Sequence, residues 1–129
     1  MPNNIPRIVL AALKGGAGKT LLSVGIVAAL LRRGLDLAVF KKGPDYIDAG
    51  WLGLAAKTAC YNLDPYLFHE RMVRGSFLRR SEDKDMAVIE GNRGIFDGVD
   101  AAGSYSTAEL AKTLQSPLVL ILDATKMTR

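Results

Sequence analysis

The segment KGGAGKT, residues 14–20, contains the residue types that bind the phosphates of a nucleotide. Its glycines let backbone N–H groups turn toward phosphate oxygens, and the helix expected after it adds partial positive charge. Lys19 is spaced to reach the β- and γ-phosphates, and the Thr20 hydroxyl is spaced to ligate Mg²⁺. The general motif begins with Gly, where this chain has Leu13. We predict ATP and Mg²⁺ as cofactors, with nucleotide contacts from Lys14, Gly15, Gly16, Ala17, Gly18, Lys19, Thr20 and Leu21.

Charged residues also follow the other apolar runs of the chain. FKKGPDYIDAG, residues 40–50, places two lysines before a turn and two aspartates after it. Glu90 comes directly after the apolar run MAVI. A Mg²⁺ ion bound to a triphosphate usually takes a further carboxylate from the end of a later strand. We assign that role to Glu90, whereas a solvated turn remains the simplest reading of residues 40–50 taken alone.

Short apolar runs alternate with helical patterns, which is typical of a parallel sheet flanked by helices. Gly34 is a helix C-cap signal, Ser106 opens a capping box, and Asp64 with Pro65 marks a helix start. Residues 91–105 hold four glycines and predict a long loop. We predict an α/β fold: a phosphate-loop NTPase-like, doubly wound, mainly parallel sheet with helices on both faces. The predicted strands cover 7–13, 35–40, 85–90 and 118–123, and the predicted helices cover 19–33, 49–57 (with Asp48 as cap), 65–80 and 106–116.

The charged clusters share one position relative to these strands. In such a sheet, ligands bind beyond the carboxyl ends of the strands. Each cluster follows a predicted strand, so we expect all of them to converge on one rim. The clusters contain Lys14 and Lys19, then Lys41 to Asp48, then Glu90 to Asp97, and finally Asp123.

Composition narrows the class of protein. The chain has 129 residues, enough for one domain, with 49% hydrophobic and 23% charged residues and a net charge of +4. Its basic residues are scattered in short pairs, so we expect no nucleic-acid partner. The longest apolar stretch, residues 21–31, is too short to span a bilayer, so we expect no membrane partner. A single cysteine fits a reducing compartment, and we predict a cytoplasmic protein.

Several motifs occur together in one order. They are KGGAGKT, FKKGPDYIDAG, NLDPYL, VIEGNRGIFDG, STAELAK and LVLILDATKMTR. In this combination the chain resembles the amino-terminal part of the cobyrinic acid a,c-diamide synthases, glutamine-dependent amidotransferases of cobalamin biosynthesis that are related to dethiobiotin synthetase. The resemblance covers essentially the whole chain. It implies that ATP phosphorylates the a- and c-carboxylates of a corrin in turn, and that ammonia then displaces phosphate from each acyl phosphate to leave an amide.

The resemblance also implies roles for particular residues. Thr20, Asp45 and Glu90 are the expected metal ligands. Either Lys41 or Lys42 is expected to hold the substrate carboxylate near the γ-phosphate, and Lys41 matches the more regular family position. The remaining expected catalytic residues are Lys19, which neutralises phosphate charge, and Asp48 and Asp97, which contact substrate or order the loops that close over it.

In the resembled family, ammonia comes from glutamine hydrolysed by a carboxy-terminal domain with a cysteine nucleophile. Cys60 has no strand-to-helix elbow around it, so we expect a structural thiol, and we expect His69 at the surface. Residues 1–129 are therefore expected to be the amino-terminal part of an ATP-binding synthetase domain, truncated after a strand, with the glutaminase domain absent.

Two departures from the family pattern keep alternatives open. Lys14 stands where the family usually has a small polar residue, and Asn92-Arg93 replaces small or apolar residues. A lysine like Lys14 is typical of MinD/ParA-type ATPase switches, in which it reaches across a homodimer interface. Such switches usually have an aspartate-rich segment in place of KKGPDYID. A nickel-tetrapyrrole a,c-diamide synthase shares these motifs, whereas GPDYID argues against cobyric acid synthase.

Overall fold

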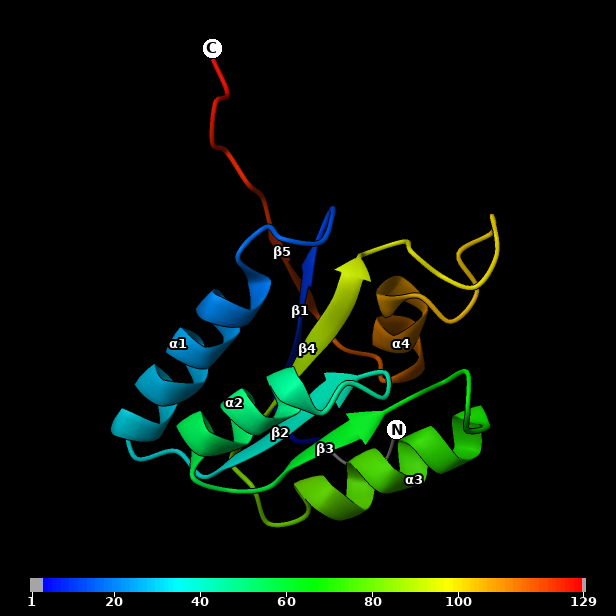
Figure 1. The fold of residues 1–129 in the computed structure, drawn as a ribbon. Helices are drawn as coiled ribbons and strands as arrows, with labels where there is room; N and C mark the ends of the chain where they lie inside the picture. Colours follow the sequence, from blue (N-terminus) through cyan, green and yellow to red (C-terminus); the bar gives the residue numbers. More distant parts are fainter. Residues whose placement is uncertain (1–3, 129) are drawn as a thin grey trace.

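The computed structural model describes residues 4–128, in which strands and helices alternate as the sequence predicts (Figure 1). The strands are β1 (Arg7–Ala12), β2 (Leu37–Lys42), β3 (Cys60–Leu63), β4 (Met86–Gly94) and β5 (Leu118–Ile121). The helices are α1 (Lys19–Arg32), α2 (Ile47–Ala56), α3 (Glu70–Ser81) and α4 (Thr107–Thr113). In this described part of the chain, no helix combines the length and the hydropathy needed to cross a membrane.

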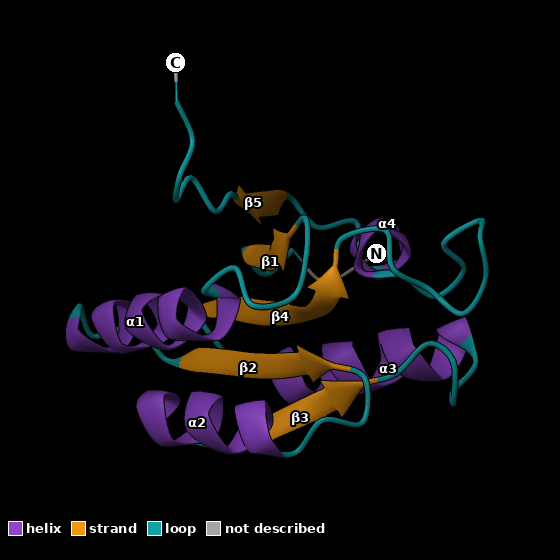
Figure 2. Cartoon of the chain, turned by 45° about the horizontal axis from the view of Figure 1, so that its top comes forward, coloured by secondary structure: helices purple, strands orange, loops and turns teal. Residues whose placement is uncertain are grey.

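The strands form one parallel sheet in the order β3-β2-β4-β1-β5. Two apolar cores cover its two faces. Val27 of α1 and Leu52 of α2 pack on one face, whereas Phe77 of α3 and Leu110 of α4 pack on the other. Figure 2 shows the sheet between these two pairs of helices. The predicted doubly wound α/β fold is therefore confirmed. It could be predicted because strands that are buried on both faces carry continuous apolar runs.

The capping signals at two helices are confirmed. Gly34 follows α1 with φ +86° and donates its N–H to Leu31 at 2.9 Å, as expected of a left-handed residue after a helix. Before α4, the Ser106 hydroxyl accepts the Glu109 N–H at 3.3 Å.

Strand β3 was not predicted. It is four residues long and lies at the edge of the sheet, where it pairs with β2. Exposed Asn62 interrupts its apolar pattern, so periodicity gave little signal. The Asn62 side chain donates to the carbonyls of Gly43 and Asp45 at 2.7 and 2.8 Å, and thereby holds the loop that follows β2.

The predicted start of the third helix was wrong. Asp64 closes a turn instead, because its carboxylate accepts the N–H groups of Tyr66 and Leu67. An aspartate can make such a turn without a helix following it. Helix α3 begins at Glu70, where the exposed His69 ring accepts the Arg71 N–H at 3.3 Å.

Two strand boundaries also differ from the prediction. β4 continues to Gly94, into the segment predicted as a loop, and its register with β1 shifts between Leu10 and Ala12. β2 starts and ends two residues later than predicted, so that Lys41 and Lys42 lie within the strand. Successive side chains in a strand face opposite sides, and the two lysines are consequently separated by the sheet.

Candidate functional site

The phosphate loop lies between β1 and α1, at the carboxyl end of the central strands. Gly16 and Gly18 have φ angles of +72° and +85°, which side-chain-bearing residues rarely adopt. The loop glycines are exposed, and α1 begins without a side-chain cap or an acidic residue in its first turn. The orphan N–H groups of this helix start are therefore suited to an anion.

Lys19, at the start of α1, is 9% exposed. Burial and the neighbouring Lys41 cation lower its pKa, and the carboxylates of Glu90, Asp48 and Asp45 oppose that shift. These acids therefore lie within electrostatic reach of the Lys19 ammonium group.

Glu90 is fully buried and joins three elements of the site. Its Oε1 atom accepts the Thr20 hydroxyl from α1 at 2.9 Å and Lys41 Nζ from β2 at 2.9 Å. Lys41 Nζ also donates to the Gly91 carbonyl at 2.8 Å and lies 3.4 Å from Asp48 Oδ2. The parallel neighbours β2 and β4 bring these residues together, since Lys41 and Glu90 are register partners.

The Oε2 atom of Glu90 is buried and has no hydrogen-bond partner among residues 4–128. A buried carboxylate oxygen beside a hydroxyl fits Mg²⁺, which takes one or two carboxylates and completes its shell with phosphate oxygens and water. Within residues 4–128, no group of three or more His, Cys, Asp or Glu side chains could hold a metal ion without such help.

The structure gives the cap predicted for Asp48 to Asp45 instead. Asp45 Oδ1 accepts the N–H groups of Ile47 and Asp48 at 2.9 and 3.0 Å, so Asp45 caps α2. Asp48 lies in the first turn of that helix rather than before it, and its carboxylate contacts Lys41. The Asp48 cap was therefore a wrong prediction, because helix α2 begins two residues earlier than expected.

Asp97 lies outside the hydrogen bonds that surround Glu90. Its Oδ2 atom accepts the Gly94 N–H at 2.9 Å and orders the turn after β4. Lys14 is largely exposed, and its ammonium group lies 3.8 Å from Asp123 after β5. The first and last strand ends therefore also meet at the predicted rim.

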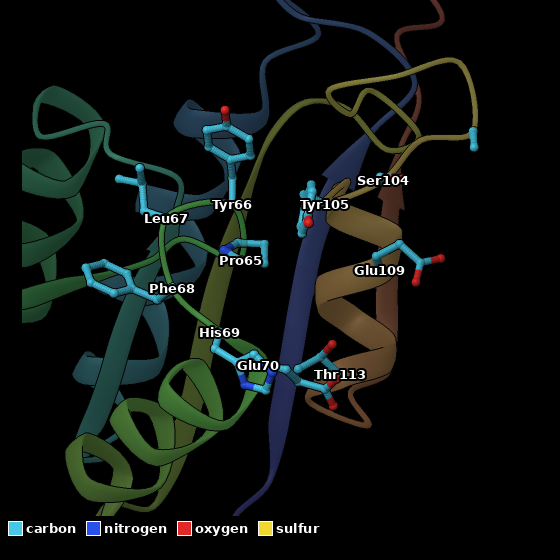
Figure 3. A pocket seen from close by; sticks show the side chains of 11 residues that line it. Pro65, Tyr66, Leu67, Phe68, His69, Glu70, Ser104, Tyr105, Glu109 and Thr113 are labelled. Atoms are coloured by element: carbon cyan, nitrogen blue, oxygen red, sulfur yellow. The ribbon is translucent and has the colours of Figure 1, made fainter.

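Lys42, which the sequence offered only as the alternative to Lys41, lies on the other face of the sheet. It lines a pocket of about 390 Å³ with Arg93 and Asp97. Tyr66 and Tyr105 line this pocket too, and they also line a second one of about 750 Å³ between α3 and α4. Figure 3 shows the second pocket, with Tyr66 and Tyr105 coming from the segments that precede these helices.

Cys60, at the start of β3, is half-buried, and burial raises the pKa of its thiol to about 12. Because only the thiolate is a good nucleophile, we expect iodoacetamide at pH 8 to alkylate the folded chain at least tenfold more slowly than the urea-denatured chain, by a rough estimate. Mass spectrometry of timed samples measures both rates. Equal rates would contradict the assignment of Cys60 as a structural thiol.

Comparison with known proteins places this geometry in a family. The family model described as the CobQ/CobB/MinD/ParA nucleotide binding domain matches residues 8–122. The chain is 48% identical over 125 residues to the cobyrinate a,c-diamide synthase of Syntrophotalea carbinolica. It is 46% identical over 129 residues to the cobyrinate a,c-diamide synthase of Magnetococcus marinus, and 44% identical over 126 residues to the hydrogenobyrinate a,c-diamide synthase of Streptomyces coelicolor.

These matches cover 96%, 100% and 97% of the chain, but 27%, 28% and 26% of the respective relatives. The chain thus spans about a quarter of the length of the curated relatives that it matches. Because the family match extends from β1 to the end of β5 and includes the phosphate loop, the chain belongs to the CobQ/CobB/MinD/ParA nucleotide-binding domain family.

Proposed function

We propose that this chain is the ATP- and Mg²⁺-binding part of an enzyme that amidates the a- and c-carboxylates of a cobyrinate-type corrin. The names of the relatives support the substrate and the reaction. The observation that carries the proposal is the bridge made by Glu90, which contacts the Thr20 hydroxyl and Lys41 while its second oxygen is left without a partner.

The chemistry begins with a carboxylate, which is a poor acyl donor and needs activation. Phosphoryl transfer depends mainly on positioning and on neutralising charge. The backbone of the phosphate loop and Lys19 bind and neutralise the phosphates. Thr20 and Glu90, with Asp45 nearby, would hold Mg²⁺, which supplies further positive charge when bound. The substrate carboxylate attacks the terminal phosphorus and ADP leaves. Ammonia then attacks the acyl phosphate, and inorganic phosphate leaves as the amide forms.

In this proposal Lys41 connects the metal site with the substrate. Its ammonium group carries three donors, two of which are used by Glu90 and Gly91. The third faces Asp48 across 3.4 Å, a distance too long for a strong hydrogen bond. The substrate carboxylate takes this third donor beside the γ-phosphate, and Asp48 holds Lys41 in place beforehand. Asp97 contributes by ordering the turn after β4.

The curated relatives are much longer than this chain, which supports a further domain in the full-length protein. Ammonia comes from glutamine, hydrolysed by a carboxy-terminal glutaminase domain outside these 129 residues. The reaction takes place in the cytoplasm. A homodimer in which Lys14 reaches the partner's nucleotide is part of the same proposal, since the Lys14 side chain is 71% exposed.

The test uses the full-length protein with ATP, Mg²⁺ and cobyrinic acid. Hydroxylamine traps acyl phosphates, so a hydroxamate of the corrin should form only when all three are present. A nickel tetrapyrrole carboxylate serves as the competing substrate. ATP hydrolysis that is stimulated by DNA or lipid vesicles, and not by a corrin, would instead favour the MinD/ParA-type switch and contradict the proposal.

Asp45→Asn tests the outer part of the metal site. Asparagine caps helices as well as aspartate does, so the start of α2 should survive the change. We expect the Mg²⁺ concentration for half-maximal activity to rise about tenfold, the lower end of the range for groups that support a metal site. ATP affinity should change much less. Asp83→Asn, in the exposed turn before β4, is the matched control. An unchanged Mg²⁺ titration would remove Asp45 from the site.

A further inference from the structure

The two adjacent lysines of β2 face different environments. Ala38 and Phe40 contribute to the core under α3 and α4, whereas Leu37 and Val39 contribute to the core under α1 and α2. By this alternation Lys41 projects toward the phosphate loop, where it meets Glu90. Lys42 projects to the other face and lines the pocket of about 390 Å³.

Lys42 carries a largely buried ammonium group. It is 9% exposed, and no hydrogen bond or ion pair joins its ammonium group to another residue in the part of the chain that the structure describes. Burial lowers its pKa, as do Lys41 and Arg93, and Asp64 alone opposes the shift. The Asp64 carboxylate is already engaged by the N–H groups of Tyr66 and Leu67. An unpaired buried charge is costly, so a bound anion would relieve this one.

Arg93 adds a second cation to the same pocket. It lies near the end of β4, next to β2, and lines the pocket with Lys42. Its φ angle of +52° is unusual for a residue with a side chain. The acids that line this pocket, Asp64 and Asp97, both accept backbone N–H groups. A guanidinium group binds a carboxylate through two parallel hydrogen bonds, which makes an organic acid the expected ligand.

Two tyrosines form an aromatic wall of the pocket that Lys42 and Arg93 line. The rings of Tyr66 and Tyr105 meet edge to face, with centroids 5.7 Å apart, and the two residues are 64% and 44% exposed. Both tyrosines line the charged pocket and also the pocket of about 750 Å³ that Figure 3 shows. The charged pocket and the larger pocket therefore share an aromatic wall. Exposed aromatic faces of this kind bind planar conjugated rings.

We propose that Lys42 and Arg93 bind a peripheral carboxylate of the corrin that is not being activated, while Tyr66 and Tyr105 contact the macrocycle. This inference rests on the proposed function and assigns a substrate-binding site to it. Lys41 acts on the reacting carboxylate at the phosphate side of the sheet, and Lys42 anchors the same molecule on the other side. The pair Lys42–Arg93 thus contributes to selecting a substrate with several carboxylates.

The test measures equilibrium binding of cobyrinic acid to the full-length protein without ATP. Lys42→Met roughly keeps the volume of the side chain and removes its charge, and Arg93→Gln keeps a polar side chain but also removes the charge. Each should raise the Kd for cobyrinic acid about tenfold, as expected for one charge-assisted hydrogen bond. The KM for ATP should stay within about twofold. Arg33→Gln, exposed at the end of α1, is the matched control.

Two further measurements separate anchoring from a structural role. Lys42→Met should leave the free energy of unfolding unchanged or raise it, because it removes an unpaired buried charge. The methyl ester of cobyrinic acid should bind the wild type much more weakly than the free acid does, and Lys42→Met should narrow that difference. If both variants bound cobyrinic acid as tightly as Arg33→Gln does, the proposed carboxylate site would be overturned and the proposed function would stand. Absence of any corrin acyl phosphate with the wild type would overturn the proposed function and the anchor with it.

Discussion

Replacing Lys19 with alanine should abolish the formation of acyl phosphate in the full-length protein, with a loss of at least about 10³-fold in rate. The Lys19 ammonium group lies at the start of α1, is mostly buried, and belongs to the same electrostatic cluster as Glu90. No other residue of the loop except Lys14 brings a full positive charge, and Lys14 is directed to Asp123. The rate of hydroxamate formation from cobyrinic acid, ATP and hydroxylamine measures the effect.

Lys84→Ala is the control for this experiment, because Lys84 forms an ion pair with Asp36 at the amino-terminal end of β2 and β4. A partly exposed pair of this kind contributes little to stability. Turnover retained by Lys19→Ala at the level of Lys84→Ala would remove Lys19 from the reaction.

Glu90→Gln should have the second largest effect, and it should appear in stability as well as in activity. The change leaves Lys41 buried beside an uncharged side chain, and breaking a buried ion pair from one side costs about 3 kcal/mol of unfolding free energy or more. It also removes the negative charge of the orphan oxygen that fits Mg²⁺. We expect activity to fall at least about 10²-fold, the scale of removing one preorganised electrostatic contact. Urea unfolding and a Mg²⁺ titration measure the two effects.

The double variant Lys41→Met with Glu90→Gln separates these two causes. Removing both charges eliminates the buried cation that the single change leaves behind. The double variant should therefore regain most of the unfolding free energy and none of the activity. If Glu90→Gln alone kept both its stability and its Mg²⁺ dependence, the bridge between Thr20, Lys41 and Glu90 would have no functional meaning.

The general architecture could be predicted because local signals agreed with it. Apolar runs covered on both faces, Gly34 after α1 and Ser106 before α4 are features that neighbouring residues determine. The convergence of the charged clusters also followed, since carboxyl ends of parallel strands lie on one rim. Hydrogen bonds from Thr20 and Lys41 to Glu90 confirm that these side chains meet. Thr20 is 70 positions and Lys41 is 49 positions away from Glu90 in the chain.

The remaining features depend on tertiary context. Strand β3 is held at the sheet edge by pairing with β2, and its own four residues carry little pattern. Asp48 and Asp64 were predicted as helix caps, and only the folded chain shows that Asp45 caps α2 while Asp64 closes a turn. The predicted strand ended two residues before the end of β2. The sequence therefore did not reveal that Lys41 and Lys42 belong to the strand and face opposite sides of the sheet.

The opposite orientation of Lys41 and Lys42 has an evolutionary consequence. Two cations that are neighbours in the chain lie on opposite faces of the sheet, because Lys41 contacts Glu90 and Lys42 lines a pocket on the far side. If Lys42, Arg93 and the tyrosines bind substrate as proposed, mutation on that face would change which acid is accepted without altering the residues around Glu90. Related enzymes with the same arrangement at the end of β2 would then differ in substrate and keep the same use of ATP.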